Sequence, residues 1–187
     1  MVFAIGACGG EKTVTIGKQV WMAKNLNDAS KGGKCYENKP KNCEKYGRLY
    51  NWEEATKACP KGWHLPSDEE WRALVHFVGG YDDVAGNKLK AKSGWESDGG
   101  GSDEYGFSAL PSGYADSDGS FGYVGDFGGW WSATEIDTGY AFNWIMQYYK
   151  SIVYKGSGNK SVLLSVRCVK DRKRHPVPLG NASPTPR

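Results

Sequence analysis

Two cysteines far apart in the chain, Cys59 and Cys168, constrain the fold more than any other feature of the sequence. Asn51 is followed three residues later by Glu54, a capping-box pattern that predicts the start of a helix ending near Cys59. The segment 165–170, which contains Cys168, predicts a strand. If the two cysteines form a disulfide, the first helix is joined covalently to the closing strand, and the chain between them can stay irregular.

A second capped helix is predicted shortly after the first. Ser67 and Glu70 repeat the capping-box spacing, and residues 63–65 predict a short strand between the two helices. The glycine pair at 79–80 should end the second helix. This helix has one apolar stripe, which predicts that this face is buried in the core. The stripe consists of Trp71, Leu74, Val75 and Val78.

The five cysteines indicate an oxidising compartment. A Cys59–Cys168 bond contributes about 4–5 kcal/mol and a Cys35–Cys43 bond about 2–3 kcal/mol through loop-closure entropy. Such bonds persist outside the cytosol, so the protein is expected to be exported. Five buried cytosolic thiols are the alternative. None of the cysteines has CxxC spacing, which disfavours a zinc site.

Both ends of the chain differ in composition from the middle. Residues 1–12 resemble the end of a bacterial lipoprotein signal, in which Cys8 would be lipidated, and a chance match is the alternative. Residues 172–187 are basic and then proline-rich, which predicts a disordered tail. Residues 13–171 are therefore expected to form one domain, and no segment of the chain predicts a transmembrane helix.

The middle of the chain is rich in glycine and aromatic residues. Residues 94–129 contain 11 glycines, which indicates an ordered functional loop, short strands or disorder. Interleaved aromatic residues argue against disorder because such rings are expected to be buried. A β-hairpin is predicted at 13–22, and later strands at 130–134, 141–146, 152–154 and 161–169. The expected fold class is α+β, with two helices packed on small antiparallel sheets and a long glycine-rich loop region.

Most kinds of catalytic or metal site find no support in the sequence. The three histidines, His64, His76 and His175, have no metal-ligand spacing and no recognisable nucleophile partner. Residues 116–119 resemble half of a calcium loop but lack the remaining ligands, so a tight turn is favoured. A net charge of +3 without a broad basic field argues against nucleic acid. We therefore expect no metal, no cofactor and no enzyme activity.

Exposed aromatic rings are the best candidates for function. Tyrosine and tryptophan rings give contact area at low entropic cost, so binding surfaces use them, although any one ring can equally belong to the core. Trp130 and Trp131 are adjacent on a strand, so at most one is expected to face the core squarely. The candidate rings are Trp130, Trp131, Tyr140, Tyr148, Tyr149 and Tyr154.

Residues 13–171 resemble the Fibrobacter succinogenes major paralogous domain, a family of exported bacterial domains in the C-type-lectin-like superfamily. The resemblance implies a C-type-lectin-like fold. The matching motifs are Val14-Thr15-Ile16-Gly17, Trp21-Met22-Ala23-Lys24-Asn25-Leu26, Tyr46-Gly47-Arg48-Leu49-Tyr50-Asn51-Trp52, Cys59-Pro60-Lys61-Gly62-Trp63-His64-Leu65-Pro66, Tyr105-Gly106-Phe107, Trp130-Trp131-Ser132-Ala133-Thr134-Glu135 and Ser165-Val166-Arg167-Cys168-Val169.

The C-terminal part is also similar to the variable proteins of diversity-generating retroelements. In those proteins, exposed residues between a Trp-Trp-Ser segment and a Ser-Val-Arg-Cys-Val strand vary. Together with Trp130, the ligand-binding face implied for this chain consists of Tyr140, Asn143, Ile145, Gln147, Tyr149, Lys150, Ser151 and Tyr154. The calcium-ligand motifs of sugar-binding animal lectins are absent, and so is the reactive cysteine pair of the formylglycine-generating enzymes, since Cys168 stands alone in its region.

We therefore expect an exported domain, at the cell surface or extracellular, that binds a protein or glycan partner and contacts a membrane only through a lipid anchor. The alternatives are a structural module of a cell-surface assembly without a ligand of its own and, more weakly, a sulfatase-modifying type of enzyme. Exposure separates the first two. Tyr140, Tyr149 and Tyr154 on one solvent-facing patch would favour binding, and their burial would favour the structural module.

Overall fold

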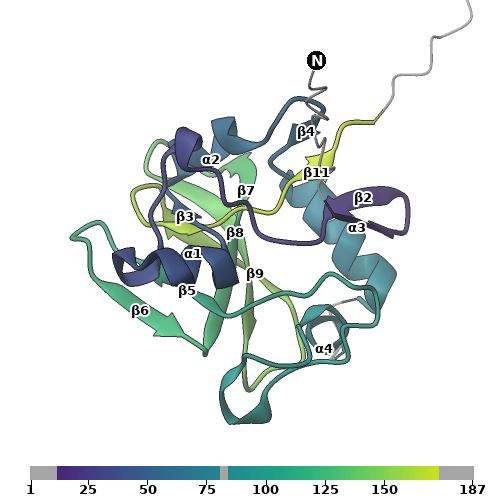
Figure 1. Ribbon diagram of the computed structural model, residues 1–187. Coiled ribbons are helices and arrows are strands. Elements are labelled where there is room, and N and C mark those ends of the chain that lie inside the picture. Colours follow the sequence, from purple (N-terminus) through teal and green to yellow (C-terminus); the bar gives the residue numbers. More distant parts are fainter. Residues whose placement is uncertain (1–11, 81–83, 173–187) are drawn as a thin grey trace, which may run out of the picture.

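The computed structural model describes residues 12–80 and 84–172 as a mixed α+β domain (Figure 1). The predictions for Cys8 and for the tail beyond residue 172 lie outside the described residues. Four strands form a small sheet and seven form a larger one. Helices α2 and α3 lie on opposite sides of the central strands of the larger sheet (Figure 1).

The small sheet contains the predicted hairpin. Its strands stand in the order β1-β2-β11-β4 and are β1 (Thr13–Ile16), β2 (Gln19–Met22), β11 (Val169–Lys170) and β4 (Trp63–His64). Thr13 pairs with Met22 and Ile16 with Gln19 around a turn in which Gly17 has a φ of 59°. The left-handed region favours glycine at this position. The hairpin prediction is confirmed.

The larger sheet is not wholly antiparallel, which corrects the prediction. Its strands are β3 (Leu49–Tyr50), β5 (Ser112–Ala115), β6 (Phe121–Val124), β7 (Phe127–Glu135), β8 (Tyr140–Gln147), β9 (Tyr154–Asn159) and β10 (Leu164–Ser165). Strands β5 and β10 both pair with β7 in parallel. Strand β6 reverses the chain between β5 and β7, so these two strands run in the same direction. The strand predicted at 152–154 begins only at Tyr154.

Both predicted helix starts are confirmed, and two short helices occur in addition. The helices are α1 (Pro40–Tyr46), α2 (Trp52–Ala58), α3 (Asp68–Val78) and α4 (Ala85–Leu89). Asn51 with Glu54 and Ser67 with Glu70 form complete capping boxes, and α3 ends at Gly79. Three single 3₁₀ turns lie at Ala29–Lys31, Tyr36–Asn38 and Glu96–Asp98.

Both predicted disulfides are present. Cys59, at the end of α2, bonds Cys168, which lies between β10 and β11, and the bond closes a loop of 109 residues. Cys35 bonds Cys43 across eight residues. The two bonds place the protein in a non-cytoplasmic compartment, because the cytosol keeps thiols reduced.

Trp130 and Trp131 are both fully buried, so the expectation that at most one would face the core is wrong. Adjacent strand residues point to opposite faces, and here both faces are covered. Trp130 packs with Trp71 of α3, at 6.3 Å between ring centroids, whereas Trp131 packs in the cluster that holds Ala55 and Ala58 of α2. The centre of the sheet is therefore a two-sided core.

The glycine-rich segment is ordered and contains short strands, which confirms one of the three alternatives. Glycine is required where the backbone passes close to another segment: a Cβ at Gly101 would collide with the carbonyl oxygen of Asn87. The segment is also held by Arg167, which is fully buried and whose Nη1 donates to the carbonyls of Met22 and Phe107. Burial lowers the pKa of this guanidinium to about 9.

Candidate binding surface

One end of the larger sheet presents half-buried rings on the face opposite α3, and we call it the tyrosine surface. Phe127 pairs with Gln147, and Ile145 with Tyr154, so these side chains share a face. Helix α2 packs on the same face in the cluster that contains Trp131 and Ala141. The tyrosine surface consists of Tyr114, Tyr123, Phe127, Ile145, Gln147, Tyr149 and Tyr154.

Two groups of rings meet on this surface. Tyr114 of β5 stacks on Tyr123 of β6 at 5.6 Å and contacts Phe127 edge-on at 5.8 Å. Tyr123 is 60% exposed and adopts a φ of 63°, which is rare for an aromatic residue. These rings are fixed by contact with one another and still reach solvent.

In the second group of rings, two tyrosine hydroxyls donate to the same amide oxygen. The Oε1 atom of Gln147 accepts hydrogen bonds from Tyr149 at 3.1 Å and from Tyr154 at 2.8 Å. The ammonium of Lys150 lies 5.5 Å from the Tyr149 ring centroid and 4.8 Å from that of Tyr154. Burial raises the pKa of the Tyr154 hydroxyl, and the neighbouring Tyr149 and Asp126 raise it further.

The buried side chain of Lys90 holds the loop that carries Tyr149 and Lys150 through hydrogen bonds to its backbone. Its Nζ atom donates to the carbonyl oxygens of Gln147, Tyr148 and Lys150 at 3.1–3.2 Å and also to that of Gly99 at 2.6 Å. Lys90 is 3% exposed, and burial lowers the pKa of its ammonium. The sequence gives no signal for this role, because Lys90 stands among other lysines at positions 88 and 92.

The structure brings only some of the predicted binding residues together. Ile145, Gln147, Tyr149 and Tyr154 lie on the tyrosine surface, Lys150 lies over its rings, and Ser151 is exposed beside them. The other predicted members, Trp130, Asn143 and Tyr140, do not join them.

Trp130 is fully buried and therefore cannot contact a ligand, which corrects its assignment. Asn143 is 4% exposed because it lies over Gly156 of β9, where a Cβ would come within 2.7 Å of the neighbouring Ile145 side chain. Tyr140 is 47% exposed, but strand alternation places it on the opposite face, with Trp144. The three tyrosines proposed as one patch are thus two tyrosines on one face and one on the other.

The sequence did not predict Tyr114, Tyr123 and Phe127 as surface residues, because aromatic residues in the glycine-rich segment were expected to be buried. The usable signal was the spacing of Tyr114 and Tyr123 around the Asp-Gly turn at 118–119, which is typical of a short hairpin. A hairpin at the edge of a sheet leaves part of its ring faces open to solvent.

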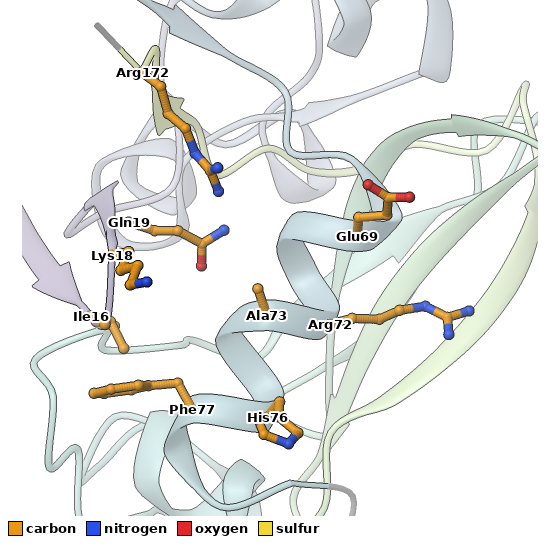
Figure 2. A pocket seen from close by; sticks show the side chains of 10 residues that line it. Ile16, Lys18, Gln19, Glu69, Arg72, Ala73, His76, Phe77 and Arg172 are labelled. Carbon is orange, nitrogen blue, oxygen red and sulfur yellow. The ribbon is translucent and has the colours of Figure 1, made fainter. Parts of the chain in front are cut away.

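Apart from the tyrosine surface, the domain has a recess between the β1–β2 turn and α3, with a volume of about 830 Å³ (Figure 2). Phe77 is 54% exposed and packs against Gly17. The Arg72 side chain points away from the recess (Figure 2). The residues around it are Ile16, Gly17, Lys18, Gln19, Glu69, Arg72, Ala73, His76, Phe77 and Arg172. Its border includes Arg172, the last described residue, so nothing in the structure shows what covers it.

His64 has the most polar surroundings of the described histidines. Its Nδ1 atom lies 2.7 Å from Asp171, and its Nε2 atom lies 3.0 Å from Glu70. Burial opposes protonation of the imidazole, but the hydrogen bonds to the two carboxylates outweigh it and raise the pKa. Because Glu70 belongs to the capping box of α3, this arrangement joins β4, α3 and the end of β11.

Within residues 12–80 and 84–172, no group of three His, Cys, Asp or Glu side chains is placed to hold a metal ion. In the same residues, no helix has the length and apolar character needed to cross a membrane.

Comparison with known proteins gives one match. The model of the Fibrobacter succinogenes major domain matches residues 14–170, which is most of the chain and all of both sheets apart from Thr13. No curated protein and no solved structure matches the chain.

Proposed function

The chain belongs to the Fibrobacter succinogenes major domain family, and from this premise we propose that it is an exported bacterial ligand-binding domain with a C-type-lectin-like fold. Its tyrosine surface binds a protein or glycan partner at the cell surface or outside the cell, and no chemical step follows. A lipid at Cys8 would tether the domain to a membrane.

The observation that carries this proposal is the half-open set of rings at the end of the larger sheet. Tyr149 is 60% exposed and Tyr154 is half-buried, yet Gln147 bonds both hydroxyls. A ring that is already ordered loses little conformational entropy when a ligand covers it. The arrangement therefore favours binding over a purely structural role, in which such rings would be buried in the core.

The architecture supports the fold assignment. The Cys59–Cys168 bond joins α2 to the segment between β10 and β11, and the glycine-rich stretch between the two cysteines folds into short strands and ordered turns. The two disulfides also support export, because they require an oxidising compartment.

The test compares ligand capture by three proteins. They are the wild-type domain, a variant with Tyr149→Ser and Tyr154→Ser, and a control with Phe77→Ser. Phe77 is a suitable control because it is 54% exposed and lies in the recess beside α3, away from the tyrosine surface. Each protein is applied to a glycan array and, immobilised, to extracts of bacterial surface proteins.

We expect the wild-type and Phe77→Ser domains to retain the same glycan or protein, and the double variant to lose it at least tenfold. Circular dichroism and thermal unfolding establish that all three are folded. If the folded double variant retains the same ligands as the wild type, the tyrosine surface is not the binding site. If no ligand is retained by any of the three, the domain is a structural module.

A further inference from the structure

The charges of this chain are unevenly distributed. All 24 lysines and arginines lie outside residues 93–149, and so do the three histidines. The acidic residues of this stretch are Glu96, Asp98, Asp103, Glu104, Asp116, Asp118, Asp126, Glu135 and Asp137. The stretch supplies β5, β6, β7 and β8, and hence most of the tyrosine surface. Strands β5 to β8 therefore carry no basic side chain of their own, which favours a cationic over an anionic ligand.

A cation already lies over the rings of this surface, and it belongs to the chain itself. The Lys150 ammonium stands over both the Tyr149 and Tyr154 rings, at 5.5 and 4.8 Å from their centroids. No carboxylate of the described residues forms an ion pair with it. The space between the two rings therefore suits an ammonium or guanidinium group. Lys150 occupies it through cation–π contacts with the rings and not through an ion pair with a described carboxylate.

Asp126 adds a negative charge beside the ring pair. It lies in the β6–β7 turn, where its carbonyl accepts from the backbone N–H of Tyr148 at 2.9 Å. Its Oδ1 atom is buried and has no hydrogen-bond partner in the described part of the chain. A buried carboxylate oxygen without a donor is costly, and a cationic ligand at the rings would offset that cost.

We propose that the ligand of the tyrosine surface is a basic protein segment, which places an arginine or lysine side chain between Tyr149 and Tyr154 and displaces Lys150. This inference rests on the proposed function and selects a protein ligand over a glycan. The Lys150 backbone stays in place because Lys90 holds its carbonyl, while its four-carbon stem can swing aside. Lys150 thus acts as a built-in competitor for the cation site.

The experiment uses a short neutral-flanked peptide with two arginines, the same peptide with citrulline at both positions, and a lysine version. Citrulline keeps the shape of arginine without its charge. Ring resonances of ¹³C-tyrosine-labelled protein are followed during titration of each peptide, and those of Tyr149 and Tyr154 are assigned from single Tyr→Phe variants. The proteins are the wild type, Lys150→Met, Asp126→Asn and the control Lys45→Met. Lys45 also stands over a tyrosine, Tyr46, at 4.7 Å, but on α1.

We expect the arginine and lysine peptides to shift the Tyr149 and Tyr154 resonances and the citrulline peptide to leave them unchanged. Lys150→Met should tighten arginine binding about two- to fivefold, because the competing cation is gone. Asp126→Asn should weaken it by a similar factor, and Lys45→Met should change nothing. The opposite signs at positions 150 and 126 distinguish charge recognition from a general loss of structure.

Equal shifts with arginine and citrulline, no shifts with any peptide, or unchanged affinity in Lys150→Met would overturn the inference. If the capture experiment still shows a ligand that depends on Tyr149 and Tyr154, the proposed function stands and only the cationic ligand is wrong. If both experiments fail, the tyrosine surface binds nothing and the proposed function falls as well.

Discussion

The cluster around Trp71 and the tyrosine surface use aromatic rings in opposite ways. Around Trp71 the rings are fully buried and meet without solvent: Trp21 at 5.0 Å, Trp144 stacked at 6.1 Å and Phe107 edge-on at 6.1 Å. On the tyrosine surface the rings touch one another but keep one side open. The two regions share strands β7 and β8, so the strands themselves do not decide which rings are buried.

The two faces of the larger sheet differ in how much of each is covered by other segments. Helix α3 and the β1–β2 hairpin close the face that holds Trp130 and Trp144. On the other face, α2 packs near Trp131 and ends at residue 58, so the far ends of β7 and β8 stay open. The comparison shows that one sheet can provide a rigid core on one face and an open aromatic surface on the other, provided that one helix is too short to cover its whole face.

The largest effect is expected for Trp71→Ala. Removing this ring leaves a cavity at the centre of the buried cluster and should lower the free energy of unfolding by about 3–5 kcal/mol. Tyr149→Ala should lower it by less than about 1 kcal/mol, because the ring is mostly in solvent. Urea denaturation of both variants measures the contrast. Similar losses would show that the tyrosine surface is part of the core.

The next effect concerns the bond that joins α2 to the closing segment. Replacing both Cys59 and Cys168 by serine should cost about 2–5 kcal/mol, whereas replacing Cys35 and Cys43 should cost less because their loop is short. Chemical denaturation without reductant compares the two double variants. If loss of the Cys35–Cys43 bond lowers the free energy of unfolding as much as loss of the Cys59–Cys168 bond, the length of the closed loop does not determine the stabilisation.

Lys90→Met should act locally and more weakly. Loss of the ammonium leaves buried carbonyl oxygens without a donor, which costs about 1–3 kcal/mol. Hydrogen exchange should rise in residues 147–151, next to the tyrosine surface, and not around Trp71. Lys92→Met is the matched control, since Lys92 is exposed two residues away. Uniform faster exchange across the domain would contradict a specific role for Lys90 in fixing this loop.

Local sequence signals predicted the elements that one segment defines. The capping boxes at Asn51 and Ser67 and the β-hairpin at 13–22 required no distant contact. The Cys59–Cys168 bond could be predicted as well, because Cys59 follows a capped helix and Cys168 lies in a strand-like segment.

Features that depend on cover by distant segments could not be predicted. Alternation places Asn143 and Ile145 on one face, but only the path of β9 with Gly156 shows that Asn143 is buried. Likewise, nothing in the sequence near Lys90 indicates that the carbonyls of residues 147–150 surround its ammonium. The aromatic-ring argument already supplied Tyr149 and Tyr154, and the resemblance added Lys150. The fold was needed to separate these residues from Trp130 and Tyr140.

The smallest expected effect is a pH dependence confined to the Trp71 side of the molecule. The pKa of His64 is raised in the folded state above its ordinary value of 6.5, so the protonated imidazole stabilises the fold. This stabilisation is fully present below about pH 6.5 and is lost as the pH rises through the folded-state pKa. Because His64 is partly exposed, the change should stay below about 1 kcal/mol.

Urea denaturation between about pH 6 and pH 9 should show this loss in the wild type and not in His64→Gln. The tyrosine resonances of residues 149 and 154 should not move over the interval in which His64 titrates, because its partners Asp171 and Glu70 lie at the end of β11 and on α3. A shift of those resonances together with the stability would mean that the tyrosine surface responds to packing around α3. The two regions would then be coupled through β7 and β8 instead of independent.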